Sequence, residues 1–263
     1  MEKDVIFITN TIKRLSIILL LVCICGLNAL SQCIDSKKIV YGGDYGLTNY
    51  NWLCPSYAFN YSGDTSKHWN FLNDPIDIKQ APAGTLPVKR KVEEAIRKFS
   101  GNEFYSNIKF NSVDIFYPKR LRLFKRAGRP DVSLKNYDHR TKYFFYYQYS
   151  PDTSASYLIG IAVTKDGKII SPFMFPPKKW YHPIDKSYTY CKLIDIARKI
   201  QPKIDPIESI KLMFDTKSQR FLWLITQELV NSHEGINYLN QVTIDAADMS
   251  QVQTIKTEES IVY

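Results

Sequence analysis

Two segments of the chain place apolar residues at the spacing of an amphipathic helix. The first begins at Thr85, has Pro87 in its first turn and Gly101 at its expected end, and carries one apolar face: Val88, Val92, Ala95, Ile96 and Phe99. The second begins near Thr189 and stops at Pro202, with an apolar stripe of Leu193, Ile194, Ala197 and Ile200. Both patterns predict a helix with one buried and one solvated face.

Each predicted helix is followed by segments that alternate apolar and polar residues, as β-strands do. After the first helix these are residues 113–117, 143–147, 161–163 and 169–170; after the second they are 210–214, 221–225, 242–244 and 252–256. The turn Lys165-Asp166-Gly167-Lys168 is a strong hairpin signal because Asp-Gly suits a tight turn. Residues 32–84 follow neither period, and they predict irregular structure with one short strand near Lys38–Tyr41.

The two helix-and-strand series align with each other. Residues 92–99 match 193–200, residues 113–117 match 210–214, and Tyr157-Leu158 through Val163 match Tyr238-Leu239 through Ile244. A sheet with one apolar face needs a cover, which a single helix provides. The sequence therefore predicts an α+β fold of two tandem two-layer units, each an amphipathic helix on a roughly four-stranded antiparallel sheet. Their expected boundaries are 85–178 and 179–263.

The first residues of the chain have the pattern of a signal peptide. Lys13 and Arg14 precede an uncharged apolar stretch, Leu15 to Leu30, and small residues around Ser31 suit a signal peptidase. We expect residues 1–31 to be removed near Ser31, because this stretch is shorter than the ~20 apolar residues of a membrane span. The alternative is a retained anchor. The sequence thus predicts an exported periplasmic or extracellular protein without a membrane span after processing.

Three cysteines remain after that cleavage, Cys33, Cys54 and Cys191. An odd number in an oxidising compartment allows one bridge and one spare thiol. A Cys33–Cys54 bridge would close the N-terminal segment on itself, whereas Cys54–Cys191 would tie that segment to the second unit. The sequence does not choose between them.

The aromatic residues of segment 32–84 suggest two alternatives. Nine large rings lie there among Gly, Asn, Ser, Asp and Pro: Tyr41, Tyr45, Tyr50, Trp52, Tyr57, Phe59, Tyr61, Trp69 and Phe71. They either pack a loop-rich segment onto the folded units or form a stacking surface for a glycan or peptide. The second alternative predicts coplanar rings exposed in a groove.

Candidate catalytic and metal-binding residues are sparse. The four histidines are His68, His139, His182 and His233; none has a second histidine at helical spacing, and no paired Cys-x-x-Cys occurs. The chain also contains no Gly-rich phosphate loop and no nucleophile elbow. We therefore expect no metal, no cofactor and no enzymatic activity. A hydrolase is an alternative that requires His139 or His233 beside a nucleophile.

The formal net charge is +9, and one segment concentrates positive charge. Five of its cations, near Leu121 and Leu123, are candidate partner-binding residues: Arg120, Arg122, Lys125, Arg126 and Arg129. One interpretation is a half-buried strand with a charged rim that discourages edge pairing. The other is a surface for an acidic protein or polyanion. Export makes nucleic acid an unsuitable partner, although such clusters can neutralise phosphates.

The second unit combines four features in order: Ile196-Ala197-Arg198-Lys199 on its helix, the turn Asp215–Ser218, the strand Arg220–Trp223 and the hairpin entry Val242–Ala246. With these features, of which Asp245-Ala246 is the specific motif, it resembles the PepSY domain, which occurs in propeptides of secreted metallopeptidases and in exported bacterial proteins. The similarity covers residues 187–257, and 85–174 more loosely. Met249 replaces the family's glycine, and Thr164-Lys165 replaces Asp-Ala in the first unit.

That resemblance implies a protein that binds and restrains peptidases, with no chemistry of its own. Secreted inhibitors of β-lactamase have a similar tandem arrangement, in which a concave sheet grips the enzyme. We therefore expect an exported, non-catalytic binding protein whose partner is a peptidase or another hydrolase. Exposed aromatic residues would be its anchors, and the candidates are Tyr143, Tyr146, Tyr149, Trp180 and Trp223. The alternatives are a glycan- or polyanion-binding surface protein and a hydrolase.

Overall fold

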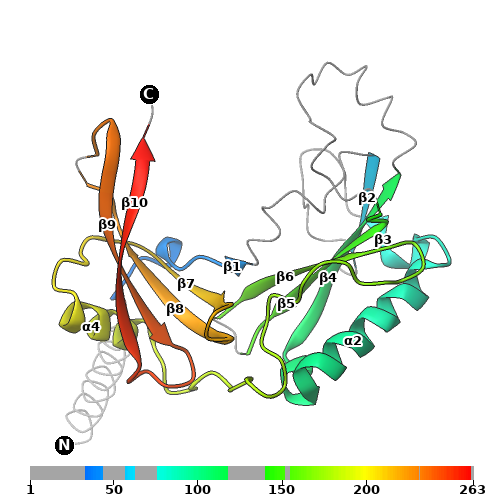
Figure 1. Ribbon diagram of the computed structural model, residues 1–263, viewed down its shortest axis with the longest axis horizontal. Helices are drawn as coiled ribbons and strands as arrows, with labels where there is room; N and C mark the ends of the chain where they lie inside the picture. The colour runs from blue at the N-terminus through cyan, green and yellow to red at the C-terminus, as the bar shows by residue number, and fades with distance from the viewer. Residues whose placement is uncertain are drawn as a thin grey trace, which may run out of the picture.

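A computed structural model describes residues 33–43, 57–62, 76–117, 140–151, 155–230 and 232–261. Two β-sheets lie next to each other, each with one α-helix on its outer side (Figure 1). The predicted signal peptide, much of the aromatic segment and the basic segment lie outside the described residues. No helix in the described ranges has both the length and the apolar character needed to span a membrane.

The first sheet has six strands in the order β1-β6-β5-β4-β2-β3. Neighbours β6, β5, β4 and β2 are antiparallel, whereas the short edge strands β1 and β3 are parallel to their neighbours. The strands are β1 (Gly42–Gly43), β2 (Tyr57–Ser62), β3 (Ile76–Asp77), β4 (Ile108–Tyr117), β5 (Tyr143–Tyr149) and β6 (Tyr157–Val163). Segment 32–84 therefore supplies three strands of this sheet, where the sequence predicts one.

Helix α2 (Thr85–Ser106) covers the first sheet with the face that the sequence predicts. Val88, Val92 and Ile96 are buried, and the face continues into buried residues further along: Ser100 and Phe104. Gly101 does not end the helix, as its position predicts, but kinks it, with φ 86° and ψ 169°. Only glycine adopts this region at low cost. The turn after the kink brings Phe104 into the core.

The second sheet has four antiparallel strands in the order β10-β9-β8-β7. They are β7 (Ile207–Asp215), β8 (Arg220–Gln227), β9 (Gly235–Asp245) and β10 (Val252–Ile261). Helix α4 (Tyr190–Ile200) packs on one face, and the Thr189 hydroxyl accepts a hydrogen bond from the Lys192 N–H at its start. Leu193, Ile194 and Ala197 are buried as predicted, but Ile200 is exposed at the helix end.

One hydrophobic core runs through both sheets. A single cluster of contacting buried side chains extends from Val88 on α2 to Met249 beside β10. At its centre the ring of Phe221 on β8 stacks on Tyr149 of β5, with ring centroids 4.8 Å apart. Phe221 also contacts Phe104 of α2 and Tyr157 of β6. Strand β8 of the second sheet thus packs, through Phe221, among aromatic side chains of the first sheet and its helix.

The predicted fold class, two tandem helix-on-sheet units of about four strands each, is therefore wrong. The described chain is mainly sheet, with six strands in one layer and four in the other. The prediction failed because it expected only one short strand in the N-terminal segment, near Lys38–Tyr41, and did not place it in either sheet. It also treated each helix and its sheet as a unit that buries its own core. The aromatic residues at the junction bury one another across the two sheets.

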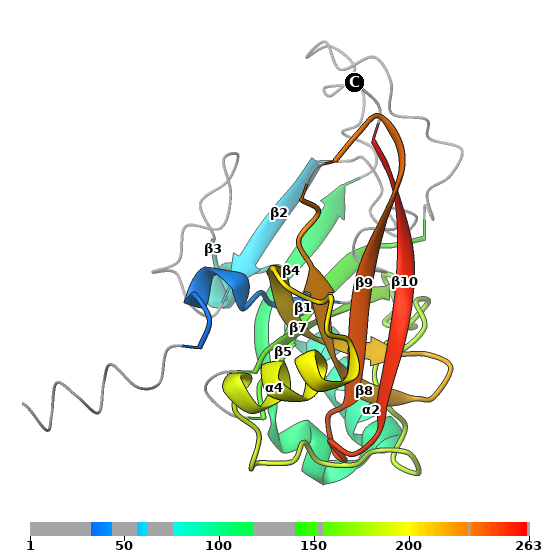
Figure 2. The same ribbon diagram turned by 90° about the vertical axis from the view of Figure 1, so that its left-hand side faces the viewer.

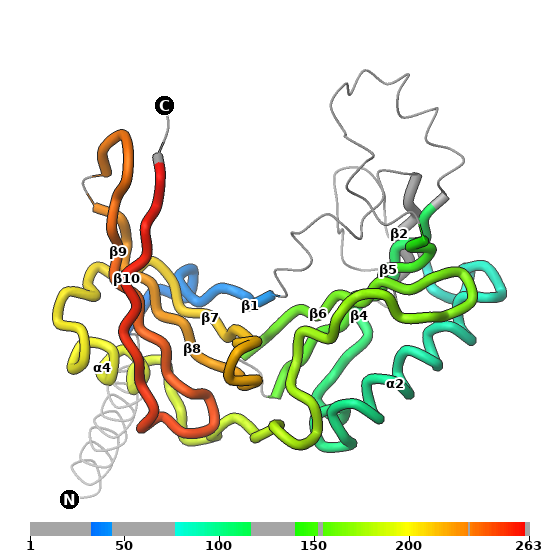
Figure 3. Tube along the Cα trace, in the orientation of Figure 1, coloured from blue at the N-terminus to red at the C-terminus, as the bar shows by residue number. Residues whose placement is uncertain are grey.

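Residues 33–43, which we call the strap, join the two sheets at their facing edges. The strap contains a short 3-10 helix, η1 (Ser36–Lys38), and then β1. The Val40 N–H donates to the Ile210 carbonyl on β7 at 3.0 Å, and the Gly42 N–H donates to the Ser156 carbonyl before β6 at 3.1 Å. Figure 3 shows this segment running from β7 toward β6.

A disulfide between Cys33 and Cys191 fixes the start of the strap to helix α4. Neither pairing considered from the sequence, Cys33–Cys54 or Cys54–Cys191, is formed. The reason is the path of the strap, which passes the second sheet before it reaches the first. That path places Cys33 next to α4.

Candidate functional site

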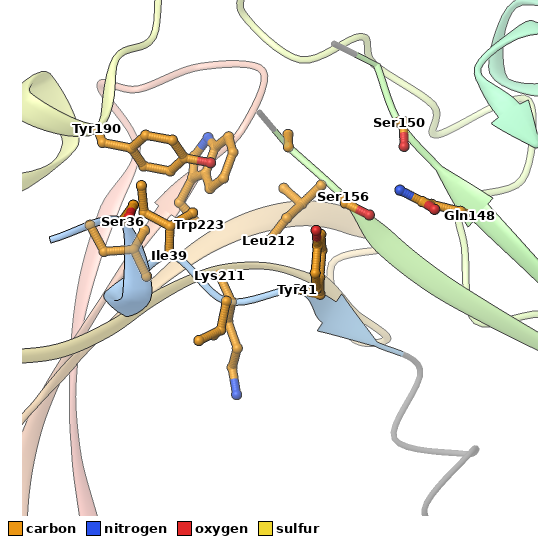
Figure 4. A pocket seen from close by; sticks show the side chains of 13 residues that line it. Ser36, Ile39, Tyr41, Gln148, Ser150, Ser156, Tyr190, Lys211, Leu212 and Trp223 are labelled. Atoms are coloured by element: carbon orange, nitrogen blue, oxygen red, sulfur yellow. The ribbon is translucent and has the colours of Figure 1, made fainter. Parts of the chain in front are cut away.

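The junction of the strap with the two sheets holds a pocket of about 290 Å³ (Figure 4). The strap forms one side, β7 and β8 form the base, and the start of α4 and the ends of β5 and β6 complete the wall. The lining residues are Ser36, Ile39, Val40, Tyr41, Gln148, Ser150, Ala155, Ser156, Tyr190, Ile210, Lys211, Leu212 and Trp223. Segments far apart in the sequence therefore build one site.

Two buried polar side chains in this lining have unmet hydrogen-bonding capacity. The Trp223 indole is 1% exposed and packs against the rings of Tyr188, at 4.6 Å between centroids, and Tyr190, at 5.9 Å. Its Nε1 makes no hydrogen bond with any described residue, and neither does the Ser156 Oγ. Buried polar groups are nearly always paired. The lining thus contains two buried polar groups whose hydrogen bonds the described residues do not supply.

The mouth of the pocket is apolar and exposed. Tyr41 is 76% exposed, and its neighbour Val40 is also exposed. Lys211 is the one charged side chain among the described lining residues, and these include no histidine and no carboxylate. The serines of the lining thus have no such base beside them. The arrangement suits binding of an amphipathic group.

Most of the aromatic anchors proposed from the sequence lie in the core. Tyr143, Tyr149 and Trp223 are buried, so the prediction that they form a binding surface is wrong. Strand alternation turns Tyr143 and Tyr149 toward α2 and the junction, where Tyr149 stacks on Phe104. Trp223 still contributes to the pocket, as part of its lining.

The other two candidates are at least partly accessible. Tyr146 lies on the opposite face of β5 and donates a hydrogen bond from its hydroxyl to Asp114 Oδ2 at 2.8 Å. Burial, followed by the nearby charge and hydrogen bond of Asp114, raises the pKa of Tyr146 well above its usual value. Trp180 is 44% exposed, with the Lys179 ammonium 5.0 Å from its ring centroid.

The remaining candidates fall into two groups. The basic residues Arg120, Arg122, Lys125, Arg126 and Arg129 lie outside the described residues, as do His68 and His139. His182 and His233 are exposed, and the backbone of His233 is paired with the Asn237 side chain. Across the described ranges, no group of three or more His, Cys, Asp or Glu side chains is arranged to hold a metal ion.

The motif pair Asp245-Ala246 shapes the turn between β9 and β10. The buried Asp245 carboxylate accepts from Arg220 Nη1 at 2.8 Å, and from the N–H groups of Ala247 and Asp248 at 2.8 and 3.1 Å. Ala246 is fully packed in the core. In the same turn, a hydrogen bond from the Ser250 hydroxyl lowers the pKa of Asp248. These carboxylates serve the turn that contains them.

The junction pocket was missed from the sequence because no local pattern marks it. The available signals were the pair Gly42-Gly43 and the apolar pair Val40-Tyr41 before it. Comparison with protein-family models, with curated proteins and with solved structures finds no match to this chain.

Proposed function

We propose that this chain is an exported, non-catalytic binding protein that holds a partner protein by taking one of its large side chains into the junction pocket. The partner class that the PepSY resemblance suggests is a secreted peptidase. Export is supported by the Cys33–Cys191 disulfide, since such bridges persist in oxidising compartments. A buried aromatic or aliphatic anchor in a pocket commonly supplies most of the energy of a protein interface.

The observation that carries this proposal is the combination of an exposed aromatic rim with unpaired polar groups beneath it. Tyr41 presents a large ring to solvent, and the Trp223 Nε1 and Ser156 Oγ, in the same pocket, have no hydrogen-bond partner among the described residues. An anchor side chain would bury apolar surface at the rim and meet these polar groups below. A volume of about 290 Å³ is sufficient for one large side chain.

Site-specific photocrosslinking tests the surface. A photoreactive phenylalanine analogue at Tyr41, in the exported protein in its native envelope, should crosslink to one partner. The control places the same group at Leu86, an exposed residue at the start of α2 away from the pocket. The purified partner should then bind the unmodified chain and lose at least ~10-fold in affinity to Tyr41→Ser, a loss of about 1.4 kcal/mol. Equal crosslinking from both positions would reject the site.

Inhibition of a peptidase tests the partner class separately. If the crosslinked partner is a peptidase, adding the purified unmodified protein should slow the hydrolysis of a protein substrate by that peptidase. The Tyr41→Ser variant should slow this hydrolysis less. A captured partner without peptidase activity would leave the junction pocket as the binding site but would reject a peptidase as the partner.

A second candidate function, binding of a neutral glycan, is favoured by one specific feature. The pocket combines aromatic rings with several neutral polar side chains, among them Ser36, Gln148 and Ser150. Rings that stack on sugar faces together with amide and hydroxyl groups suit such a ligand. Calorimetric titration with neutral oligosaccharides distinguishes the two: heat that is abolished by Tyr41→Ser would favour the glycan over the protein anchor.

A further inference from the structure

The outer edge of β10 is open over an unusual length. β10 spans ten residues and pairs with β9 without a register shift. In the described part of the chain, no strand pairs with its other edge. Proteins commonly protect such an edge with proline, a bulge, a short strand or charged side chains. β10 has none of the first three, and its charges are of both signs: Lys256, Glu258 and Glu259. Its unpaired backbone groups can accept another strand.

The outer half of this edge belongs to a two-stranded ribbon. β8 pairs with β9 only over Gln241–Asp245, whereas β10 follows β9 to its beginning at Gly235. In Figures 1 and 2 the outer ends of β9 and β10 rise beyond the rest of the sheet. A two-stranded ribbon is marginally stable in water by itself. Pairing with a further strand would stabilise it.

Hydrogen-bonded and non-hydrogen-bonded residue pairs alternate between β9 and β10, and this alternation identifies the backbone groups of β10 that point to the open edge. The Asp245 N–H donates to the Gln251 carbonyl at 2.9 Å, and these residues continue the β9–β10 register. Odd-numbered residues of β10 therefore direct their N–H and C=O groups to β9. The even-numbered residues direct theirs to the open edge: Thr254, Lys256, Glu258 and Ser260.

An antiparallel partner must bring its own outward-directed groups opposite these. For a second copy of β10, that requirement allows registers in steps of one residue, and the central ones are centred on Ile255, Lys256, Thr257 or Glu258. Centring on Ile255 leaves Lys256 opposite Thr254 and Glu258 opposite Val252, with no ion pair. Centring on Lys256 or Glu258 sets like charges directly opposite each other, which is unfavourable. Centring on Thr257 sets Lys256 of each copy opposite Glu258 of the other. Charge complementarity thus selects one register.

We infer that two copies of this chain pair antiparallel through β10, centred on Thr257, and form one continuous sheet across a twofold axis. Two Lys256–Glu258 ion pairs flank the axis, and Thr254 lies opposite Ser260. The Lys256 ammonium is held 4.6 Å from the exposed ring of Tyr238, on the same face as Glu258. This interface goes beyond the proposed function, because no residue of β10 lines the junction pocket.

Charge reversal tests the register. In the mature chain, Glu258→Lys sets two ammonium groups opposite each other on both sides of the axis, so the dimer dissociation constant measured by analytical ultracentrifugation should rise at least ~10-fold. Lys256→Glu should weaken the dimer similarly. The double variant Lys256→Glu/Glu258→Lys should dimerise as the unmodified protein does. An equimolar mixture of the two single variants should form heterodimers. Circular dichroism of each variant checks the fold.

The matched control is Glu259→Lys, which makes the same charge change one residue away. Glu259 would face Ile255 of the other copy, so its reversal should alter dimerisation by less than about two-fold. An unmodified protein that is monomeric at its highest soluble concentration would overturn the inference. A dimer weakened equally by Glu259→Lys and Glu258→Lys would overturn it as well.

A crosslink provides a test that does not depend on charge. Thr257 would face Thr257 of the other copy at a non-hydrogen-bonded position, where opposite Cα atoms lie about 4.5 Å apart. Thr257→Cys, in a Cys54→Ser background, should therefore form disulfide-linked dimers on mild oxidation. Glu259→Cys in the same background has no cysteine opposite and should crosslink far more slowly. Equal rates would contradict the register.

Discussion

The backbone of Gly42 packs directly against the carbonyl group of Leu212: a Cβ atom on Gly42 would lie 1.6 Å from that oxygen. The two residues belong to the strap and to β7, so this contact brings the N-terminal segment against the second sheet while the Gly42 N–H bonds to the first. No side chain fits between them. The junction of the two sheets therefore depends on a missing Cβ.

Gly42→Ala should detach or displace the strap. The obstacle is a backbone carbonyl, which cannot rotate away like a side-chain end, so we expect a loss of about 3 kcal/mol in the free energy of unfolding. Urea denaturation measures it. Gly43→Ala is the control, because its Cβ would meet Leu158 Cβ at 4.0 Å, an ordinary contact. That variant should change stability by no more than about 1 kcal/mol, and equal losses would refute the proposed packing.

The Cys33–Cys191 disulfide should stabilise the fold strongly. It joins residues 158 positions apart, so it restricts the unfolded chain over most of its length. The loop-entropy relation gives about 4 to 5 kcal/mol for loops of this order. Cys33→Ser/Cys191→Ser should lower the unfolding free energy by up to that amount in urea titrations. Cys54→Ser should leave the bridge intact in non-reducing peptide maps, and a Cys33–Cys54 peptide would contradict the structure.

Local elements were predictable from the sequence, whereas the junction was not. Thr189 caps α4 and the Val88-Val92-Ile96 face covers the first sheet, because capping and helical periodicity act between neighbours in the chain. The alternation Tyr143–Tyr149 predicts a strand but does not reveal that Phe144, on its other face, is also buried, with Phe116 and Ala162. Packing on both faces depends on segments remote in sequence.

The pocket and the disulfide could not be predicted for the same reason. The contacts of Gly42 with Leu212 and of Tyr149 with Phe221 depend on how the edges of the two sheets meet. No local sequence pattern encodes the distance between those edges. Trp223 illustrates the consequence: its position in an alternating strand fits either a core residue or a surface anchor. In the structure it is a core residue that also lines the pocket.

Asp245 should be essential to the β9–β10 turn. Asp245→Ala would leave two backbone N–H groups and the Arg220 guanidinium without their acceptor in a largely buried place. We expect a loss of about 3 kcal/mol in unfolding free energy. Asp245→Asn keeps one acceptor oxygen and should lose about half as much. If both variants match the unmodified protein in thermal and urea denaturation, the carboxylate does not hold the turn.

Tyr147→Phe should stabilise the protein. The Tyr147 hydroxyl is buried in the first sheet and makes no hydrogen bond with any described residue. Removing an unpaired buried hydroxyl while keeping the ring should raise the unfolding free energy by about 1 kcal/mol. Tyr149→Phe is the matched control: the Tyr149 hydroxyl lies 3.3 Å from the Tyr181 hydroxyl, so its removal should cost stability. A loss of stability in Tyr147→Phe would indicate an unrecognised partner.

The same residue should also shape the alkaline stability of the protein. Burial, followed by the charges of Glu93 and Tyr105, raises the pKa of Tyr147 well above its usual value. The folded state thus keeps this proton at a pH where the unfolded chain has lost it, so this ionisation leaves the unfolding free energy unchanged below pH ~10 and lowers it above that pH. Each such group lowers the unfolding free energy by about 1.4 kcal/mol per pH unit in that range.

Tyr147→Phe should therefore make the loss of unfolding free energy above pH ~10 less steep, as measured by urea titrations at a series of alkaline pH values. An unchanged slope would show that Tyr147 ionises as readily in the folded protein as in the unfolded chain.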